Sequence, residues 1–285
     1  MSDTAYQTMY RQEFIAGFEK RTSLVRRTVT TETEVKGNEA VFLVADSGGA
    51  TAVTRGVNGD IPTRPDNLNQ FTATLQEWHD VPERNNFNLF ASQGDGRRIM
   101  QQASMGVINR KIDTDIHAAL SAATVTKTMT QTTKIAFLSD LLGLIVTLSE
   151  ANAIDAGVPE EQEPFALITP AFRANMMQLD QFTSMDFINL KPFANISKSR
   201  AFNWNGCNWI VDTGLSGMGS TSTCYMYSRN AIGHACDNTS IKTFVGYDDK
   251  NDKSWARCSA YMGSKLLQNS GIVKISHDDT DLTLT

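Results

Sequence analysis

The longest helical pattern in the chain lies between residues 97 and 122. Apolar side chains recur there every three or four positions, at Ile99, Ala103, Val107, Ile108, Ile112, Ile116 and Leu120. This spacing is typical of a helix with one apolar face, and Asp95 and Gly96 precede it where a cap belongs. The pattern predicts a helix on the order of 40 Å long, at about 1.5 Å per residue, to which other elements attach.

Polar side chains occupy the positions beside this apolar stripe. Asp113, Asp115 and His117 are therefore expected on a solvated or lateral face of the helix. Asp113 and His117 are four residues apart, the spacing at which helical side chains meet. We interpret them as a surface ion pair rather than as a catalytic dyad.

Two predicted strands, residues 39–44 and the alternating residues 71–75, flank a connection of 24 residues rich in glycine and proline. Compact domains seldom contain such a connection without a use for it. We predict a projecting two-stranded loop that reaches a partner; the alternative is a surface insertion without function. The residues predicted to make contacts crowd the tip of this loop: Arg55, Asn58, Asp60 and Arg64.

An aromatic stripe with a four-residue spacing marks the first turns of the chain, at Tyr6, Tyr10, Phe14 and Phe18. Such a stripe fits a short amphipathic helix packed on the protein's own core. Its narrow width and terminal position also fit an extended arm that lies on a neighbouring subunit. We predict the second arrangement.

Beyond the long helix, the periodicity predicts both helices and strands. Residues 135–153 have a helical period, and residues 165–169 form a short buried strand. Thr169 is placed to cap a helix that begins at Pro170, where the missing N–H of proline costs least. These elements predict an α+β fold.

The last hundred residues are rich in predicted strands. Residues 241–247 and 254–262 are expected to form a hairpin with a charged tip. The final strand, residues 271–277, is expected to direct His277 outward.

Composition limits the function classes. The chain has 285 residues, of which 41% are hydrophobic and 20% charged, as in ordinary folded proteins. A net charge of −5 argues against a nucleic-acid-binding protein, and no apolar run is long enough to span a membrane. With no secretory signal in its first residues, we expect the protein in a reducing cytoplasm, its four widely spaced cysteines as buried free thiols.

The sequence contains no recognisable catalytic motif. It has no G-x-S-x-G elbow and no H-E-x-x-H pair. The acidic run from Asp248 to Asp252 lacks the glycine and the ligand spacing of a calcium loop. We therefore predict that the protein is not an enzyme and has no metal or cofactor.

The order of these parts resembles that of the major capsid proteins of tailed bacteriophages, which have the Hong Kong 97-type fold. The resemblance covers nearly the whole chain and is one of layout. Its most specific segments are ASMGVINRKIDTDIHAAL in the long helix, FALITPAFRANMMQL in the strand–proline–helix unit and SAYMGSKLLQNSGIVKI near the C-terminus.

The resemblance implies a division of the chain into the parts of a capsid subunit. Residues 1–38 would be an N-terminal arm and residues 39–84 the extended β loop with its base. Residues 85–134 would form the peripheral domain with the long spine helix, and residues 135–239 the axial domain. Residues 240–285 would be a C-terminal β segment that returns to the peripheral domain.

By this resemblance, the protein assembles with itself into hexamers and pentamers that close an icosahedral shell around double-stranded DNA, without sequence-specific binding. Its location would be the virion capsid, assembled in the host cytoplasm, without a membrane. A portal and, in some relatives, a cement protein are further partners. The chain begins directly at the arm, without the helical leader of some relatives, so we expect a separate scaffolding protein.

Some members of this family join their subunits through an isopeptide bond that starts from a lysine in the extended loop. Here Lys36 and Lys111 bracket that loop, and no lysine lies between them. We therefore expect a shell held together without covalent bonds between subunits, by contacts of arginine with carboxylates or by a cement protein.

Two alternatives stay open at this point. Encapsulins are similar in fold but enclose protein cargo, and neighbouring genes for a portal and a terminase would distinguish a phage capsid from them. The other alternative is an unrelated enzyme or carbohydrate-binding β domain, which a monomer with a deep pocket would favour.

Overall fold

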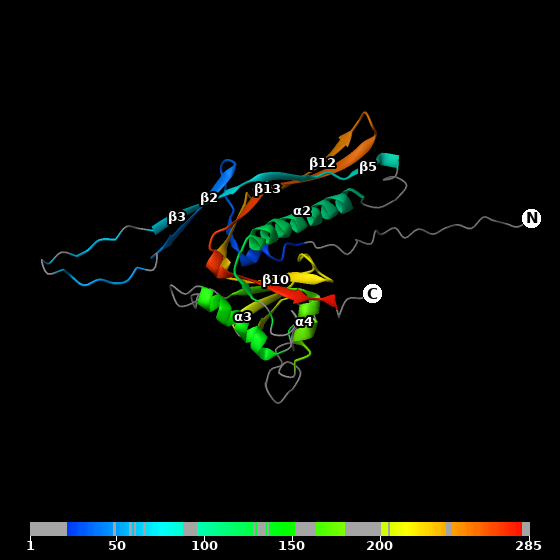
Figure 1. Ribbon diagram of the computed structural model, residues 1–285. Coiled ribbons are helices and arrows are strands. Elements are labelled where there is room, and N and C mark those ends of the chain that lie inside the picture. The colour runs from blue at the N-terminus through cyan, green and yellow to red at the C-terminus, as the bar shows by residue number, and fades with distance from the viewer. Residues whose placement is uncertain are drawn as a thin grey trace, which may run out of the picture.

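The computed structural model describes two six-stranded sheets, a two-stranded ribbon and three α-helices (Figure 1). The description covers residues 22–47, 50–56, 59, 61–64, 67–87, 96–127, 129, 135, 137–151, 164–179, 201–204, 206–237 and 241–280.

One six-stranded sheet is built around a single long strand, β13, and is called the β13 sheet here. Its strand order is β1, β11, β13, β12, and two further strands, β4 and β5, also pair with β13. The bounds are β1 Thr30–Glu32, β11 Ile232–Cys236, β13 Lys253–Leu266, β12 Lys242–Asp248, β4 Gln76–Asp80 and β5 Glu83–Asn85. β12 and β13 form the predicted hairpin, and β13 extends further than the sequence pattern indicates.

Helix α2, Gly96–Ser121, lies along the β13 sheet and confirms the predicted long helix (Figure 1). Its apolar stripe is buried at Ile108, Ile112, Ile116 and Leu120. The helix also makes polar contacts with the sheet, because the Ser104 hydroxyl donates to the carbonyl of Asp80 at 3.2 Å. The amphipathic pattern thus identifies both the helix and the face that the sheet covers.

The other six-stranded sheet is called the β10 sheet. Its order is β6, β14, β10, β7, β9, β8, with β6 parallel to β14 and β7 parallel to β9. The bounds are β6 Thr126–Lys127, β14 Ile272–Asp278, β10 Thr221–Tyr227, β7 Phe165–Ile168, β9 Cys207–Val211 and β8 Ala201–Trp204.

Helices α3, Leu138–Ala151, and α4, Pro170–Met176, pack against the β10 sheet (Figure 1). The centroid of the Phe172 ring of α4 lies 4.8 Å from the ring centroid of His277 on β14. It lies 6.3 Å from the ring centroid of Trp209 on β9. Thr169 caps α4 as predicted, because its hydroxyl accepts the Phe172 N–H at 3.2 Å.

The segment that leads into β1 fastens the two sheets to each other. Val25 and Val29 are fully buried in the common core. The Thr28 hydroxyl lies in the short 3-10 helix η1, Arg26–Thr28, and hydrogen-bonds the hydroxyl of Tyr227 on β10. β1 itself pairs in parallel with β11 of the β13 sheet. Two further 3-10 helices, η2 Arg229–Ala231 and η3 Asn269–Gly271, precede β11 and β14.

The two sheets do not divide at residues 239 and 240, where the expected boundary between the axial part and the C-terminal segment falls. β11 precedes this boundary but lies in the β13 sheet, whereas β14 follows it and lies in the β10 sheet. The outward orientation predicted for His277 is also wrong, since its side chain is fully buried between β10, β14 and α4.

The ribbon consists of β2, Glu39–Asp46, and β3, Asn67–Thr74, paired antiparallel over their whole length from Glu39–Thr74 to Asp46–Asn67. It extends away from both sheets toward the left of Figure 1. The predicted two-stranded projection is therefore present, and its strands are longer than the sequence pattern indicates.

Candidate assembly interface

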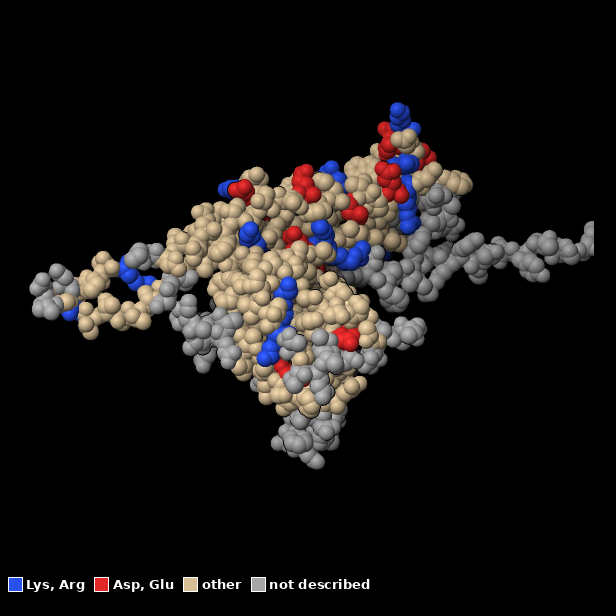
Figure 2. All heavy atoms as spheres, viewed as in Figure 1, with Lys and Arg blue, Asp and Glu red and all other residues tan. Residues whose placement is uncertain are grey.

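The outward face of the ribbon carries three exposed large apolar side chains among polar ones. Paired residues of an antiparallel ladder point to the same side, so Val41, Leu43 and Leu68 share one face of the ribbon. Their exposed fractions are 48%, 64% and 55%. Figure 2 shows mostly uncharged surface along the ribbon, with basic side chains in the loop at its far end and charged side chains where it joins the body. A cluster of exposed large apolar side chains on a projecting element favours a protein–protein contact at this face.

The structure describes two of the four predicted loop-tip residues. Arg55 and Arg64 are exposed, whereas Asn58 and Asp60 lie outside the described residues. The Arg64 guanidinium donates to the carbonyl of Ser47 at 2.8 Å. This hydrogen bond links the two sides of the loop just beyond the ribbon, so Arg64 contributes to the shape of the loop within its own subunit.

The predicted contact residues of the N-terminal arm, Tyr6, Tyr10, Phe14 and Phe18, also lie outside the described residues. The description begins at residue 22, where the chain enters the core described above.

The polar side chains of α2 contact three different parts of the molecule. Asp113 is buried and accepts hydrogen bonds from the Ser23 hydroxyl and, at 3.3 Å, from the Val25 N–H. His117 contacts Asp212, which follows β9, with 3.2 Å between Nε2 and Oδ2. The predicted surface pair of Asp113 and His117 is wrong, because both side chains face into the molecule rather than into solvent.

Asp115 faces the β13 sheet. Its Oδ2 accepts the Ser264 hydroxyl at 2.6 Å, and the Ser264 oxygen lies 2.8 Å from Nδ1 of His234. Since the serine proton is donated to Asp115, His234 donates to Ser264 from Nδ1. Burial lowers the pKa of His234 to about 4 and raises the pKa of Asp115. The spine helix is thus fixed to the N-terminal segment, the β13 sheet and the β10 sheet by adjacent polar residues.

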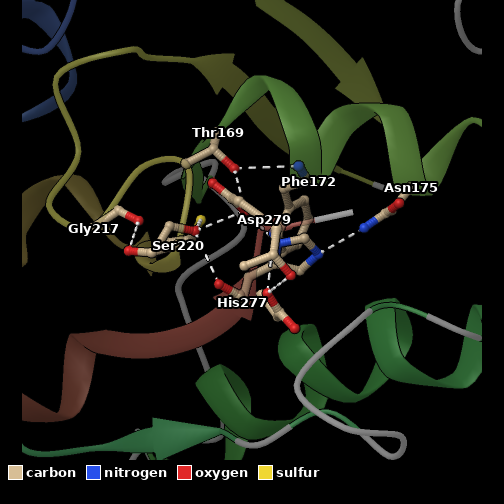
Figure 3. A network of polar contacts seen from close by, with 11 residues as sticks. Thr169, Phe172, Asn175, Gly217, Ser220, His277 and Asp279 are labelled. Carbon is tan, nitrogen blue, oxygen red and sulfur yellow. Dashed lines mark hydrogen bonds and ion pairs between the residues drawn. The ribbon is translucent and has the colours of Figure 1, made fainter. Parts of the chain in front are cut away.

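A second buried polar network joins β14, β10 and α4 (Figure 3). One carboxylate oxygen of Asp279 accepts from Nδ1 of His277 at 2.7 Å, from Ser222 at 3.0 Å and from Thr169 at 3.1 Å. Asn175 of α4 lies 3.2 Å from the other ring nitrogen of His277. All of these side chains are buried, so the network holds secondary structure elements together and does not present a hydroxyl to a substrate.

The acidic run from Asp248 to Asp252 forms the tip of the β12–β13 hairpin. Its carboxylates accept hydrogen bonds within the hairpin: Asp248 accepts from the Lys250 N–H at 3.0 Å and from Asn251 at 2.7 Å. These hydrogen bonds hold the pKa of the Asp248 carboxyl below its usual value. Figure 2 shows acidic and basic side chains gathered at this end of the molecule, opposite to the ribbon.

All four cysteines, Cys207, Cys224, Cys236 and Cys258, are buried and free, as predicted. Burial raises the pKa of the Cys224 thiol to about 12, so this thiol is unreactive at neutral pH.

Within the described ranges, no group of three or more His, Cys, Asp or Glu side chains could hold a metal ion. Among the described helices, none has the length and apolar character needed to cross a membrane.

Solved structures of phage capsids have this fold. The chain matches a structure described as Mycobacterium phage Che8 with a TM-score of 0.76 and 11% identity, covering 96% of this chain and 98% of that one. It matches the capsid of Ralstonia phage GP4 with a TM-score of 0.72 and 10% identity, covering 99% and 98%. For the capsid of a native GTA particle, the TM-score is 0.73 at 11% identity, with 96% of both chains covered. No curated protein sequence matches the chain.

These matches show that the chain has the fold seen in phage capsid structures. The sequence matches the family described as phage capsid protein over residues 2–279, and the chain belongs to this family. Its function is that of a major capsid protein in the virion shell, and the encapsulin alternative is not favoured. The family is one of structural proteins.

Proposed function

We propose that the subunit assembles into the hexamers and pentamers of an icosahedral shell that encloses double-stranded DNA, with the β2–β3 ribbon lying on a neighbouring copy. The observation that carries this proposal is the cluster of Val41, Leu43 and Leu68 on one face of the ribbon, which is exposed in the single subunit. Full burial of such a side chain contributes about 1.5–3 kcal/mol. Three of them on one projecting ribbon favour association strongly.

In this proposal the β13 sheet with α2 is the peripheral part of the subunit, and the β10 sheet with α3 and α4 is the axial part. The distribution of the strands between the two sheets supports this assignment, with β11 peripheral and β14 axial. Arg55, Asn58, Asp60 and Arg64 of the loop, and Tyr6, Tyr10, Phe14 and Phe18 of the arm, are proposed as additional contacts between subunits.

The proposed partners beyond other copies of the chain are a scaffolding protein, a portal and a cement protein, with assembly in the host cytoplasm. Family membership supports them. Co-expression with the candidate proteins encoded beside the capsid gene, followed by electron microscopy, tests each one by its effect on the yield of closed particles.

The proposal is tested by Leu43→Asp. The substitution places a carboxylate on the apolar face of the ribbon, where burial against another copy would leave it unpaired. We expect the yield of assembled particles to fall at least about tenfold, the factor that corresponds to 1.4 kcal/mol. Light scattering and negative-stain electron microscopy measure this yield.

Leu43→Met is the matched control, because it retains an apolar side chain of similar volume at the same position. It should assemble like the unmodified protein, and both variants should unfold within about 0.5 kcal/mol of it, as expected for an exposed site. Normal assembly of Leu43→Asp would show that this face of the ribbon is not an interface.

A further inference from the structure

Two glycines of the β13 sheet lie where the ribbon leaves the body of the subunit. Gly263 of β13 lies under the end of β3: a Cβ atom there would come within 2.2 Å of the carbonyl oxygen of Thr74. Gly233 of β11 lies under β2: a Cβ atom there would come within 2.9 Å of the ring of Phe42. A side chain larger than hydrogen would therefore clash with the main chain at Gly263 and would displace the Phe42 ring at Gly233.

Both glycines belong to the same face of the sheet. Ala235 pairs with Gly263, and Gly233 is two residues from Ala235 on the same strand, so the three point to one side. His234 and Ser264, the neighbours of Gly233 and Gly263, point to the other side, where they contact Asp115 of α2. The ribbon base thus packs on the face opposite to the spine helix.

The contacts at the two glycines differ in kind. At Gly233 the sheet meets a side chain, the Phe42 ring, which can move if atoms are removed from it. At Gly263 the sheet contacts the main chain of the ribbon at Thr74, immediately before Leu75 and the start of β4. Because β4 is fixed to β13 by its own pairing, the main chain at Thr74 has little freedom to move.

We propose that Gly233 and Gly263 form a seat that sets the direction in which the β2–β3 ribbon leaves the subunit. The buried pair Ala40 and Ala73 at the ribbon base completes this close packing, since both side chains are small. The seat positions the ribbon for assembly, which rests on the proposed function of the ribbon as an interface.

A small change at the seat has a large effect at the far end of the ribbon. The eight residues of β2 span about 25 Å at roughly 3.3 Å per residue, so a rotation of about 10° at the base moves the far end by about 4 Å. A displacement of this size is large compared with the fit that a packed interface requires.

The test measures the ribbon direction in the full-length chain. Cysteines introduced as Val53→Cys in the loop and Lys250→Cys at the hairpin tip carry spin labels, because both positions are exposed and the four native cysteines are buried. Labelled protein is mixed with an excess of unlabelled protein, so that electron–electron distance measurements report pairs within one chain. We expect Gly233→Ala and Gly263→Ala to shift the main distance by several ångströms.

Gly271→Ala is the matched control, since its Cβ would lie 2.9 Å from the Cβ of Ala231, a similar crowding away from the ribbon. Its distance distribution should equal that of the parent. Adding Phe42→Leu should restore the parent distance to Gly233→Ala but not to Gly263→Ala, where the crowding involves the main chain. Phe42→Ala alone, which only removes atoms, should broaden the distribution even if the alanine variants fail to fold.

If the distance distribution is unchanged in the folded alanine variants or in Phe42→Ala, the proposal that Gly233 and Gly263 set the ribbon direction is wrong. Particle shape tests the separate claim about assembly. Variants with a displaced ribbon should form particles of altered diameter, or tubes, by electron microscopy. If the ribbon is displaced but the particles keep their shape and yield, the proposal about the two glycines stands. The proposed role of the ribbon as an interface would then be contradicted.

Discussion

At the scale of single residues, the neighbours in space decide what each polar side chain does. Asp113, Asp115 and His117 occupy successive odd positions of α2, yet each contacts a different part of the subunit. Each of these contacts crosses a boundary between elements that are far apart in the sequence. The polar side of α2 therefore also connects this helix to the rest of the subunit.

The buried His234 predicts a pH dependence of stability. Its pKa is about 4 in the folded chain and about 6.5 in an unfolded one. Between these values the unfolded chain binds a proton that the folded chain does not, so stability is lost as the pH falls from 6.5 to 4. The loss from this residue is about 3 kcal/mol, at 1.36 kcal/mol per pKa unit.

His234→Asn isolates this contribution, because the asparagine amide can still donate to Ser264. Denaturant unfolding at pH 6.5 and pH 4.5 should show a smaller loss of stability in the variant than in the unmodified protein. Asp115, whose pKa is raised, acts in the opposite direction, but it is present in both proteins and cancels in the comparison. Equal losses in the two proteins would rule out His234 as the cause.

At the scale of elements, the β12–β13 hairpin is held by its turn. Asp252 has a φ of 49°, a left-handed conformation that non-glycine residues seldom adopt. Its carboxylate accepts the Tyr247 hydroxyl at 2.7 Å and the Asn86 amide at 3.0 Å. These hydrogen bonds offset the cost of the backbone conformation and connect the hairpin to β5 and the residues after it.

Two substitutions separate these effects. Asp252→Ala removes the hydrogen bonds and keeps the backbone cost, whereas Asp252→Gly removes both. The alanine variant should therefore be less stable than the glycine variant by about 1 kcal/mol. Thermal or denaturant unfolding measures the difference, and hydrogen exchange in β12 should follow the same order. A glycine variant less stable than the alanine variant would contradict the argument.

Local patterns in the sequence were sufficient to predict α2, α3, the capped helix α4, the β2–β3 pair and the β12–β13 hairpin. Each of these is defined by periodicity, a turn-rich connection or a cap within a single continuous stretch of the chain. The sequence did not predict that β14 inserts beside β10 while β11 joins β13, because strand pairing between distant segments leaves no local signal. His277 was placed outward for the same reason, since only the position of α4 shows that this side of β14 is covered.

The candidate interface was predictable only in outline. The glycine-rich connection between two strands indicated a projecting loop. The apolar face of the ribbon, however, depends on the register between β2 and β3, which brings Val41, Leu43 and Leu68 to one side. The seat at Gly233 and Gly263 involves strands about 200 residues from the ribbon, so no local pattern could identify it.

At the scale of the whole molecule, the described part of the subunit consists of two packed sheets with their helices and a ribbon that extends away from them. The absence of lysine from residues 37–110 excludes an isopeptide bond that starts from a lysine of the ribbon or its loop. Lys111, the next lysine, lies on α2 with its Nζ 3.7 Å from the centroid of the Trp78 ring, and is therefore engaged within its own subunit.

Purified particles should accordingly separate into single chains on a denaturing gel, with heating and without reductant, because the cysteines are buried as well. Particles treated with a lysine-reactive cross-linker provide the control, in which higher bands must appear. A ladder of bands in untreated particles would reveal a covalent link that these residues do not predict.

The connection of β1 to β11 has a consequence for the timing of synthesis. Thr30 pairs with Gly233, and the β10 sheet needs β14, which ends at Asp278. Residues near the start of the chain therefore cannot form these contacts until nearly the whole chain has been synthesised. The common core closes late, as expected for contacts between such distant segments. Incomplete nascent chains therefore cannot complete this core.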